Sequence, residues 1–183
     1  MTITEFFQQS EGKWSSQRTT HDLATKQSIG GKSDLWIDLL STDEPTVVSL
    51  CQQAGADLAT VQTAFRVRWE GQFGTKAEKG STLMVAIAAP GSTTEGTLLS
   101  QPSKPGAALI QTHYSLGEDE ALTLVTEQDS VHAEERIWYA SPSLRFRTST
   151  IKQADGFSMA SFCSEIRMGG AKPAPSQQAT AQA

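Results

Sequence analysis

Cysteine is scarce in this sequence, which has two cysteines, Cys51 and Cys163, among 183 residues. They form no C-x-x-C pair, which argues against a disulfide framework and a structural zinc site and fits a reducing compartment. No stretch reaches about 18 apolar residues, so we expect no membrane-spanning helix. The initial MTITEFFQQSEGKW lacks the basic region of a signal peptide. These absences predict a soluble, cytoplasmic protein.

Charge is also sparse: charged residues make up 19% of the sequence and hydrophobic residues 38%. Serine, threonine, glutamine and glycine fill the remainder, which is typical of a β-rich protein with a polar surface. The formal net charge is −5. Binding to nucleic acid needs clustered cations, so nucleic acid is not expected as a partner. Walker, Rossmann, HExxH and GxSxG motifs are all missing from the sequence.

Two segments have helical patterns. Thr2 and Glu5 have the spacing of a capping box, which predicts a short N-terminal helix that ends before Gly12. A second S-x-x-E sequence at 41–44, followed by proline, predicts a helix after the second strand. The expected apolar faces are Ile3, Phe6 and Phe7 in the first helix, and Val47, Leu50, Cys51 and Ala54 in the second.

The remaining segments are predicted to be β-strands separated by turn residues. Gly30 and Gly31 interrupt the second strand, where we predict a bulge or a bend. Short spacing without helices between most strands predicts an antiparallel meander, which an up-and-down barrel closes best. The predicted strands are 14–21, 27–40, 65–73, 81–88, 96–101, 108–116, 121–126, 130–139, 144–152 and 157–168.

The predicted fold is therefore all-β with minor helices: an antiparallel up-and-down β-barrel of about ten strands. We assign residues 1–170 to this single domain. Residues 171–183 contain no aliphatic side chain larger than alanine. Burial cannot offset the ordering entropy of such a segment, so we predict a disordered tail.

Charged residues on apolar strand faces are the candidate site residues, because the interior of such a barrel can hold one small ligand. Arg18 shares a strand face with Trp14, and Glu135 interrupts an apolar face. Burial of an unpaired charge is costly, so each of these two needs a partner. Arg145 and Arg147 form a cationic stripe suited to carboxylate binding.

Each candidate also has a structural interpretation. Arg145 and Arg147 could form a solvated outer face, since strand parity does not tell which face points inward. Glu135 could form a structural ion pair with Arg18. Two further candidates are Trp69 and His21. Trp69 could be a core residue, and His21 could be a surface histidine or one satisfied by hydrogen bonds. His113 and His132 lie on different strands without ligand spacing, so no metal site is expected.

Three stretches carry a resemblance to a known family. They are EFFQQSEGKWSSQRTTHDL with its continuation KQSIGGKSDLWIDLL, then RVRWEGQF, then AEERIWYASPSLRFRTSTIKQADGFSMASFCSEIRMG. Over about residues 1–169 the chain resembles the S-type (CpcS/CpeS) phycobiliprotein lyases of cyanobacteria. The resemblance implies a calycin-type barrel, similar to lipocalins and fatty-acid-binding proteins, with Arg167 packed over Trp14.

The resemblance also implies a chemistry. These lyases bind a linear tetrapyrrole such as phycocyanobilin, as a transferred substrate and not as a resident cofactor. They attach it through a thioether to a cysteine of an apo-phycobiliprotein subunit, of the phycocyanin or allophycocyanin type. The lyase itself needs no nucleophile, so Cys51 and Cys163 need not react. A homodimer, or a heterodimer with a paralogous lyase, is compatible with the family.

The family's functional positions fall on charged and aromatic residues of this sequence. The resemblance gives catalytic roles to Glu135 and Arg147, with the alternative registers of Glu134 and Arg145 left open. A bilin has two propionates, which suit arginines, and a long conjugated body, which suits tryptophans. A second family tryptophan is missing after Trp69, where Phe73 or Thr75 stands. The expected bilin-binding residues are Trp14, Arg18, His21, Trp69, Arg145 and Arg147.

Two alternative functions stay open at this point. A non-catalytic carrier of bilin, haem or fatty acid would bind a ligand in the barrel without forming a covalent adduct on another protein. A structural chaperone for phycobiliprotein subunits would bind protein without bilin.

Overall fold

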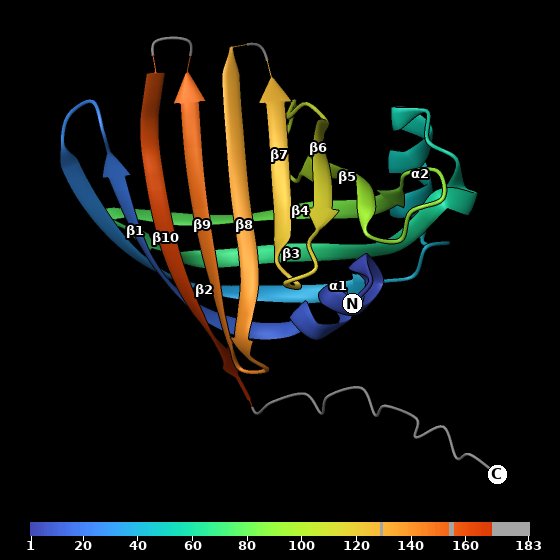
Figure 1. The fold of residues 1–183 in the computed structure, drawn as a ribbon, viewed down its shortest axis with the longest axis horizontal. Coiled ribbons are helices and arrows are strands. Elements are labelled where there is room, and N and C mark those ends of the chain that lie inside the picture. The colour runs from blue at the N-terminus through green and yellow to red at the C-terminus, as the bar shows by residue number, and fades with distance from the viewer. Residues whose placement is uncertain (129, 154–155, 170–183) are drawn as a thin grey trace.

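The described residues form ten strands that close into one antiparallel barrel, with β10 hydrogen-bonded to β1 (Figure 1). The computed structural model describes residues 1–128, 130–153 and 156–169. The predicted fold class, the number of strands and the places of both helices are confirmed. The elements are α1 (Ile3–Ser10), β1 (Gly12–Asp22), β2 (Gln27–Leu40), α2 (Pro45–Ala54), a 3₁₀ turn (Leu58–Thr60), β3 (Val61–Phe73), β4 (Lys76–Ala88), β5 (Glu95–Pro102), β6 (Ile110–Leu116), β7 (Leu122–Gln128), β8 (Val131–Ser141), β9 (Leu144–Gln153) and β10 (Gly156–Met168).

Helix α1 covers one end of the barrel, near the turn between β8 and β9 (Figure 1). It begins with the predicted capping box, in which the Thr2 side chain accepts from the backbone of Glu5 and the Glu5 carboxylate accepts from the backbone of Thr2. The Phe7 ring stacks on Phe65 of β3 at 4.1 Å between centroids. The Ser10 hydroxyl lies 2.6 Å from the hydroxyl of Tyr139 on β8. These contacts fix the helix as a lid on the barrel interior.

Helix α2 packs against the outside of the barrel. It starts next to the predicted 41–44 segment, but Glu44 and not Ser41 is the N-cap and no side chain caps the helix. Pro45 occupies the first helical position, which leaves the residue before it as the cap, and the Ser41 hydroxyl donates to Asp43 instead. Cys51 is fully buried, as predicted for a helical core residue. It belongs to a cluster with residues of β3, β4 and β5: Ala64, Leu83, Val85 and Leu99.

A bulge or a bend was predicted at Gly30 and Gly31, and the bulge is wrong. The pairing of β2 with β1 runs through both glycines without a shift in register, and the pairing with β3 reaches Gly31. Gly31 is needed for another reason: a Cβ there would come within 2.7 Å of the Phe73 ring and 2.9 Å of the Gln72 carbonyl oxygen. The missing side chain therefore lets β3 approach β2 closely and leaves room for Phe73 inside the barrel.

The end of the barrel near α1 holds the main core, which is centred on Trp14. As the family resemblance implies, the Arg167 guanidinium packs over the Trp14 ring, 4.2 Å from its centroid. Arg167 also donates to the carbonyl oxygens of Glu11 and Gln9, which ties β10 to the end of α1. Among the described residues, no helix is long and apolar enough to cross a membrane. The tail predicted at 171–183 lies outside the described residues.

Candidate functional site

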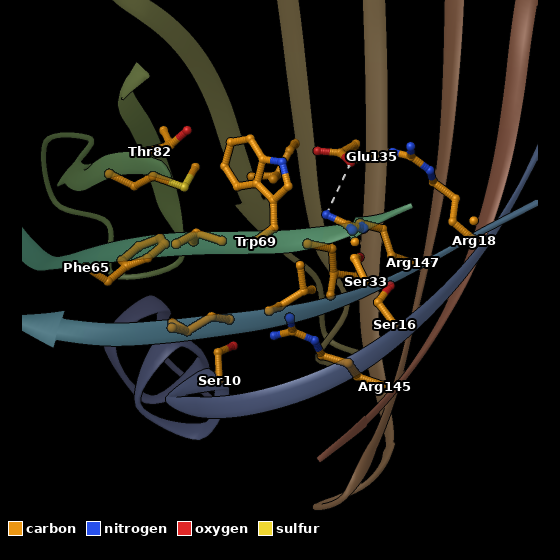
Figure 2. A pocket seen from close by; sticks show the side chains of 18 of the residues that line it. Ser10, Ser16, Arg18, Ser33, Phe65, Trp69, Thr82, Glu135, Arg145 and Arg147 are labelled. Carbon is orange, nitrogen blue, oxygen red and sulfur yellow. Dashed lines mark ion pairs between the residues drawn. The ribbon is translucent and has the colours of Figure 1, made fainter. Parts of the chain in front are cut away.

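A cavity of about 320 Å³ lies inside the barrel (Figure 2). One part of its wall is apolar and buried, and the other part carries charged side chains. The apolar wall includes Phe6, Phe65, Trp69, Leu98, Leu124 and Ile137. The charged lining consists of Arg18, Glu78, Glu135, Arg145 and Arg147. Arg145 and Arg147 therefore face the interior, which decides the question that strand parity left open.

Glu165 of β10 anchors the two arginines of β9. Arg145 Nε donates to Glu165 Oε2 at 2.5 Å, and Arg147 Nη2 donates to Glu165 Oε1 at 3.0 Å. The Ser16 hydroxyl adds a longer bond to the same carboxylate, at 3.4 Å. The Glu165 side chain is only 1% exposed and that of Arg145 is 7% exposed. A buried carboxylate with charge-assisted partners on both oxygens holds both guanidinium groups in fixed positions.

The pKa values of this cluster follow from its geometry. Burial alone would raise the pKa of Glu165, but the guanidinium groups of Arg147 and Arg145 outweigh burial and lower it. Burial likewise opposes the charge of Arg147, while the carboxylates of Glu165 and Glu135 raise its pKa overall. Both side chains are therefore charged at neutral pH, and Arg147 is a permanent cation on the cavity wall.

Glu135 lies beside Arg147, as the dashed line in Figure 2 shows. Glu135 Oε1 is 3.8 Å from Arg147 Nη1, and the Glu135 side chain is 39% exposed. Glu135 lines the cavity whereas Glu134 is exposed, so Glu135 is the one of the two that faces the interior. The ion pair considered between Glu135 and Arg18 is wrong. Strands β9 and β10 separate β8 from β1 in the barrel, so Arg147 of the adjacent β9 is the nearer cation.

Arg18 pairs instead with Glu78 of β4. The two side chains are 3.6 Å apart between Nη2 and Oε2, and both are about 40% exposed (40% and 41%). The Arg18 guanidinium also lies over the Phe73 ring, 4.2 Å from its centroid. Phe73 thus stands in the cavity wall in the stretch where the second family tryptophan is missing.

Trp69 projects from β3 into the cavity (Figure 2). Its indole lies over Gly80, the residue with which it pairs on β4. A Cβ at Gly80 would come within 2.3 Å of the indole, so only glycine lets the ring adopt this position. Trp69 therefore presents a flat apolar surface to the cavity.

Two of the expected bilin-binding residues do not line the cavity. Trp14 is fully buried and lies between the guanidinium groups of Arg145 and Arg167, at 4.5 and 4.2 Å from its ring centroid. It supports Arg145 from behind and does not face the cavity. His21 is exposed near the end of β1, where its Nδ1 lies 2.7 Å from the Ser28 hydroxyl. Side chains alternate along β1, so His21 points away from the face that carries Arg18.

This architecture has a counterpart among known protein families. The family model described as "CpeS-like protein" matches residues 2–168 of this chain. The chain belongs to the CpeS family.

Members of the CpeS family from several organisms are similar over nearly the whole chain. A protein of Thermosynechococcus vestitus named "Chromophore lyase CpcS/CpeS" is 49% identical over 178 residues, which cover 96% of this chain and 98% of the relative. "Phycocyanobilin lyase subunit CpcS" of Picosynechococcus sp. is 32% identical, with 90% and 85% covered. The structure of the S-type phycobiliprotein lyase CpeS from Guillardia theta superposes with a TM-score of 0.80 at 31% identity and covers 93% of this chain and 94% of that one.

Glu165 and Glu78 are the site residues of this CpeS-family chain that sequence reasoning missed. A signal for Glu165 was present, because Cys163, Glu165 and Arg167 share one parity on β10 and Arg167 was expected to face Trp14. The register then pairs Glu165 with Arg145. For Glu78 the sequence held no such signal, since its strand was predicted to start at 81.

The thiols of the chain are not arranged as nucleophiles. Burial raises the pKa of the Cys51 thiol, which lies between α2 and the outside of the barrel. Burial also raises the pKa of Cys163, against the opposing effect of Arg147. Both thiols are therefore protonated at neutral pH. In the part of the chain that the structure describes, no group of three or more histidine, cysteine, aspartate or glutamate residues is placed to hold a metal ion.

Proposed function

We propose that this chain is a phycobiliprotein chromophore lyase that holds a phycocyanobilin-like bilin in its barrel and attaches it to a cysteine of an apo-phycobiliprotein subunit. One observation carries the proposal: three arginines of a CpeS-family barrel line a cavity that also has an extensive apolar and aromatic wall. The names of the relatives support it, since one is a phycocyanobilin lyase subunit and another is an S-type phycobiliprotein lyase.

The cavity suits a linear tetrapyrrole with two propionates. Two adjoining recesses, of about 320 and 260 Å³, share Glu135 with the main cavity and extend it along the barrel. Of the three arginines that line the cavity, Arg18 and Arg147 have partly exposed side chains, at 40% and 29%. They bind the propionates, since charge-assisted bonds to carboxylates are strong and arginine forms them in pairs. Trp69 and Phe73 stack against the pyrrole rings.

The chemical step is an addition. The sulfur of the acceptor cysteine forms a bond to the exocyclic ethylidene carbon of the bilin, and the thiol proton is taken up by the bilin, so nothing is oxidised or reduced. The lyase holds the bilin in one geometry and leaves the reacting end open to the acceptor. Glu135 favours the protonated pyrrole nitrogens, and Arg147 holds a propionate in place.

The acceptor subunit in this proposal is of the phycocyanin or allophycocyanin type. A free acceptor thiol needs a reducing compartment, so the reaction takes place in the cytoplasm. Assembly as a homodimer, or with a paralogous lyase subunit, stays a prediction.

Co-expression with bilin-making enzymes and candidate apo-subunits tests this function. Subunits are separated on a denaturing gel, and covalent bilin is scored by zinc-induced fluorescence. We expect a labelled subunit band that is lost in the variant with Arg18→Ala and Arg147→Ala together. Arg136→Ala is the matched control, because Arg136 of β8 is 49% exposed and pairs with Asp119 outside the cavity. An unlabelled subunit with every candidate would refute the function.

A further inference from the structure

The charged lining of the cavity is already balanced. Within the barrel, Arg18 pairs with Glu78 and Arg145 pairs with Glu165. Arg147 pairs with both Glu165 and Glu135. A ligand with two carboxylates therefore enters a site whose cations are not free. It must replace carboxylates of the protein, and the structure indicates which ones.

The three glutamates differ in how firmly they are held. Glu165 is 1% exposed and bonded at 2.5 and 3.0 Å, whereas Glu135 and Glu78 are 39% and 41% exposed. The closest approaches of the latter two to their arginines are 3.8 and 3.6 Å, too long for a good hydrogen bond. Such half-exposed pairs contribute little to stability. Glu165 therefore stays paired with its arginines, whereas Glu78 and Glu135 can be replaced by other carboxylates.

The pair between Arg18 and Glu78 has an unusual reach. Strands β1 and β4 are not neighbours, because β2 and β3 lie between them in the barrel. Gly31 pairs with Arg18 and Gly71 pairs with Glu78, so the wall between the two charged residues carries no side chain at these positions. Arg18 and Glu78 thus meet across the inner surface of two strands, at the partly exposed part of the cavity. Their separation would free the face of the Phe73 ring over which the Arg18 guanidinium lies.

We propose that Glu78 and Glu135 stand in for the carboxylates of the ligand and are displaced when it binds. This inference rests on the proposed function. One ligand carboxylate replaces Glu78 at Arg18, and the other replaces Glu135 at Arg147. The displaced Glu135 then accepts hydrogen bonds from the ligand's N–H groups. The arrangement selects for dicarboxylates, because a ligand without carboxylates leaves both pairs closed.

The test is an absorbance titration of the full chain with phycocyanobilin and with its dimethyl ester, which has the same rings but no free carboxylates. Removing the competing charge by Glu78→Gln should tighten binding of the diacid about two- to fivefold, the range expected for one partly exposed ion pair. Binding of the diester should not change. Glu70→Gln is the control, because Glu70 is exposed and follows Trp69 on β3, on the opposite face.

A second variant tests whether the effect of Glu78→Gln depends on Arg18. In an Arg18→Ala background no cation remains for Glu78 to occupy, so Glu78→Gln should then have no effect on the diacid. Equal tightening of diacid and diester would overturn the proposal, since the gain would then not depend on the carboxylates of the ligand. Unchanged or weaker binding of the diacid by the Glu78→Gln variant would also overturn it. Failure of the wild-type chain to bind either ligand would refute the proposed function itself.

Discussion

Arg145 and Glu165 face each other on neighbouring strands, with Arg145 Nε 2.5 Å from Glu165 Oε2 and both side chains almost excluded from water. The Arg145 guanidinium is also held against the Trp14 ring at 4.5 Å. Because Arg145 has these two partners, it is a fixed part of the wall. Arg147 shares the same carboxylate but remains 29% exposed to the cavity. One arginine thus belongs to the scaffold, and the other remains partly accessible in the cavity.

Glu165→Gln should destabilise the barrel. The change leaves the buried charge of Arg145 without its carboxylate, and breaking a buried ion pair from one side costs about 3–5 kcal/mol. The free energy of unfolding from denaturant titrations measures this loss. Glu78→Gln serves as the control and should stay within about 1 kcal/mol of wild type, because its ion pair is exposed. Similar losses in the two variants would contradict the anchoring role of Glu165.

The stability of the wild-type chain should fall in acid in a way that depends on Glu165. Its pKa is lower in the folded barrel than the ordinary value of 4.5. A lowered pKa gives stability that is fully present above about pH 4.5 and is lost as the pH falls toward the folded pKa. The Glu165→Gln variant lacks this component, so its free energy of unfolding should vary less between about pH 5 and pH 3. Parallel curves for the two proteins would show that Glu165 is not a coupled carboxylate.

Arg147→Ala should weaken bilin binding by about tenfold or more, given about 1.5–3 kcal/mol for a hydrogen bond to a charged group. The absorbance change on titration with phycocyanobilin measures it. Arg136→Ala, on the outside of β8, should bind as wild type does. Unchanged titrations for both Arg18→Ala and Arg147→Ala would place the bilin elsewhere.

Glu135→Gln should change the chromophore more than the fold. The side chain is 39% exposed and its ion pair is loose, so stability should stay within about 1–2 kcal/mol of wild type. The amide no longer favours protonated pyrrole nitrogens, so the red absorption band of the bound bilin should shift and transfer should slow. A wild-type spectrum and rate with a lowered melting temperature would make Glu135 a structural residue.

Replacement of both cysteines should leave attachment intact. Both thiols are buried and protonated, and neither lines the main cavity. We expect the variant with Cys51→Ala and Cys163→Ala to label the acceptor subunit at a rate close to wild type, as measured by zinc fluorescence. Loss of labelling with an unchanged far-UV circular dichroism spectrum would indicate a thioether intermediate on the lyase.

Strand alternation was sufficient to predict much of the barrel and part of the site. It placed Glu135 and Trp69 on inward faces, and both line the cavity. It could not choose the face of Arg145, since an arginine fits a solvated surface as well as a buried ion pair. That choice depends on Glu165, which lies beside Arg145 only through the register of β9 with β10.

Strand alternation could not predict contacts between strands that are distant in the sequence. The partner of Arg18 is on β4 and not on β8, because barrel order decides which inward side chains meet. Local signals also failed where two of them competed. The S-x-x-E spacing suggested that Ser41 caps α2, but Pro45 at the first helical position makes Glu44 the cap.

Transfer from a preloaded lyase tests the central claim most directly. The purified chain is saturated with phycocyanobilin, separated from free bilin and mixed with an apo-phycobiliprotein subunit. Covalent bilin on the subunit is then followed over time on denaturing gels. We expect bilin to leave the barrel and become covalently bound to the subunit, and we expect this to be slower with the Glu135→Gln chain. Bilin that stays bound to the barrel, with no covalent label on any subunit, would contradict it and identify the chain as a carrier.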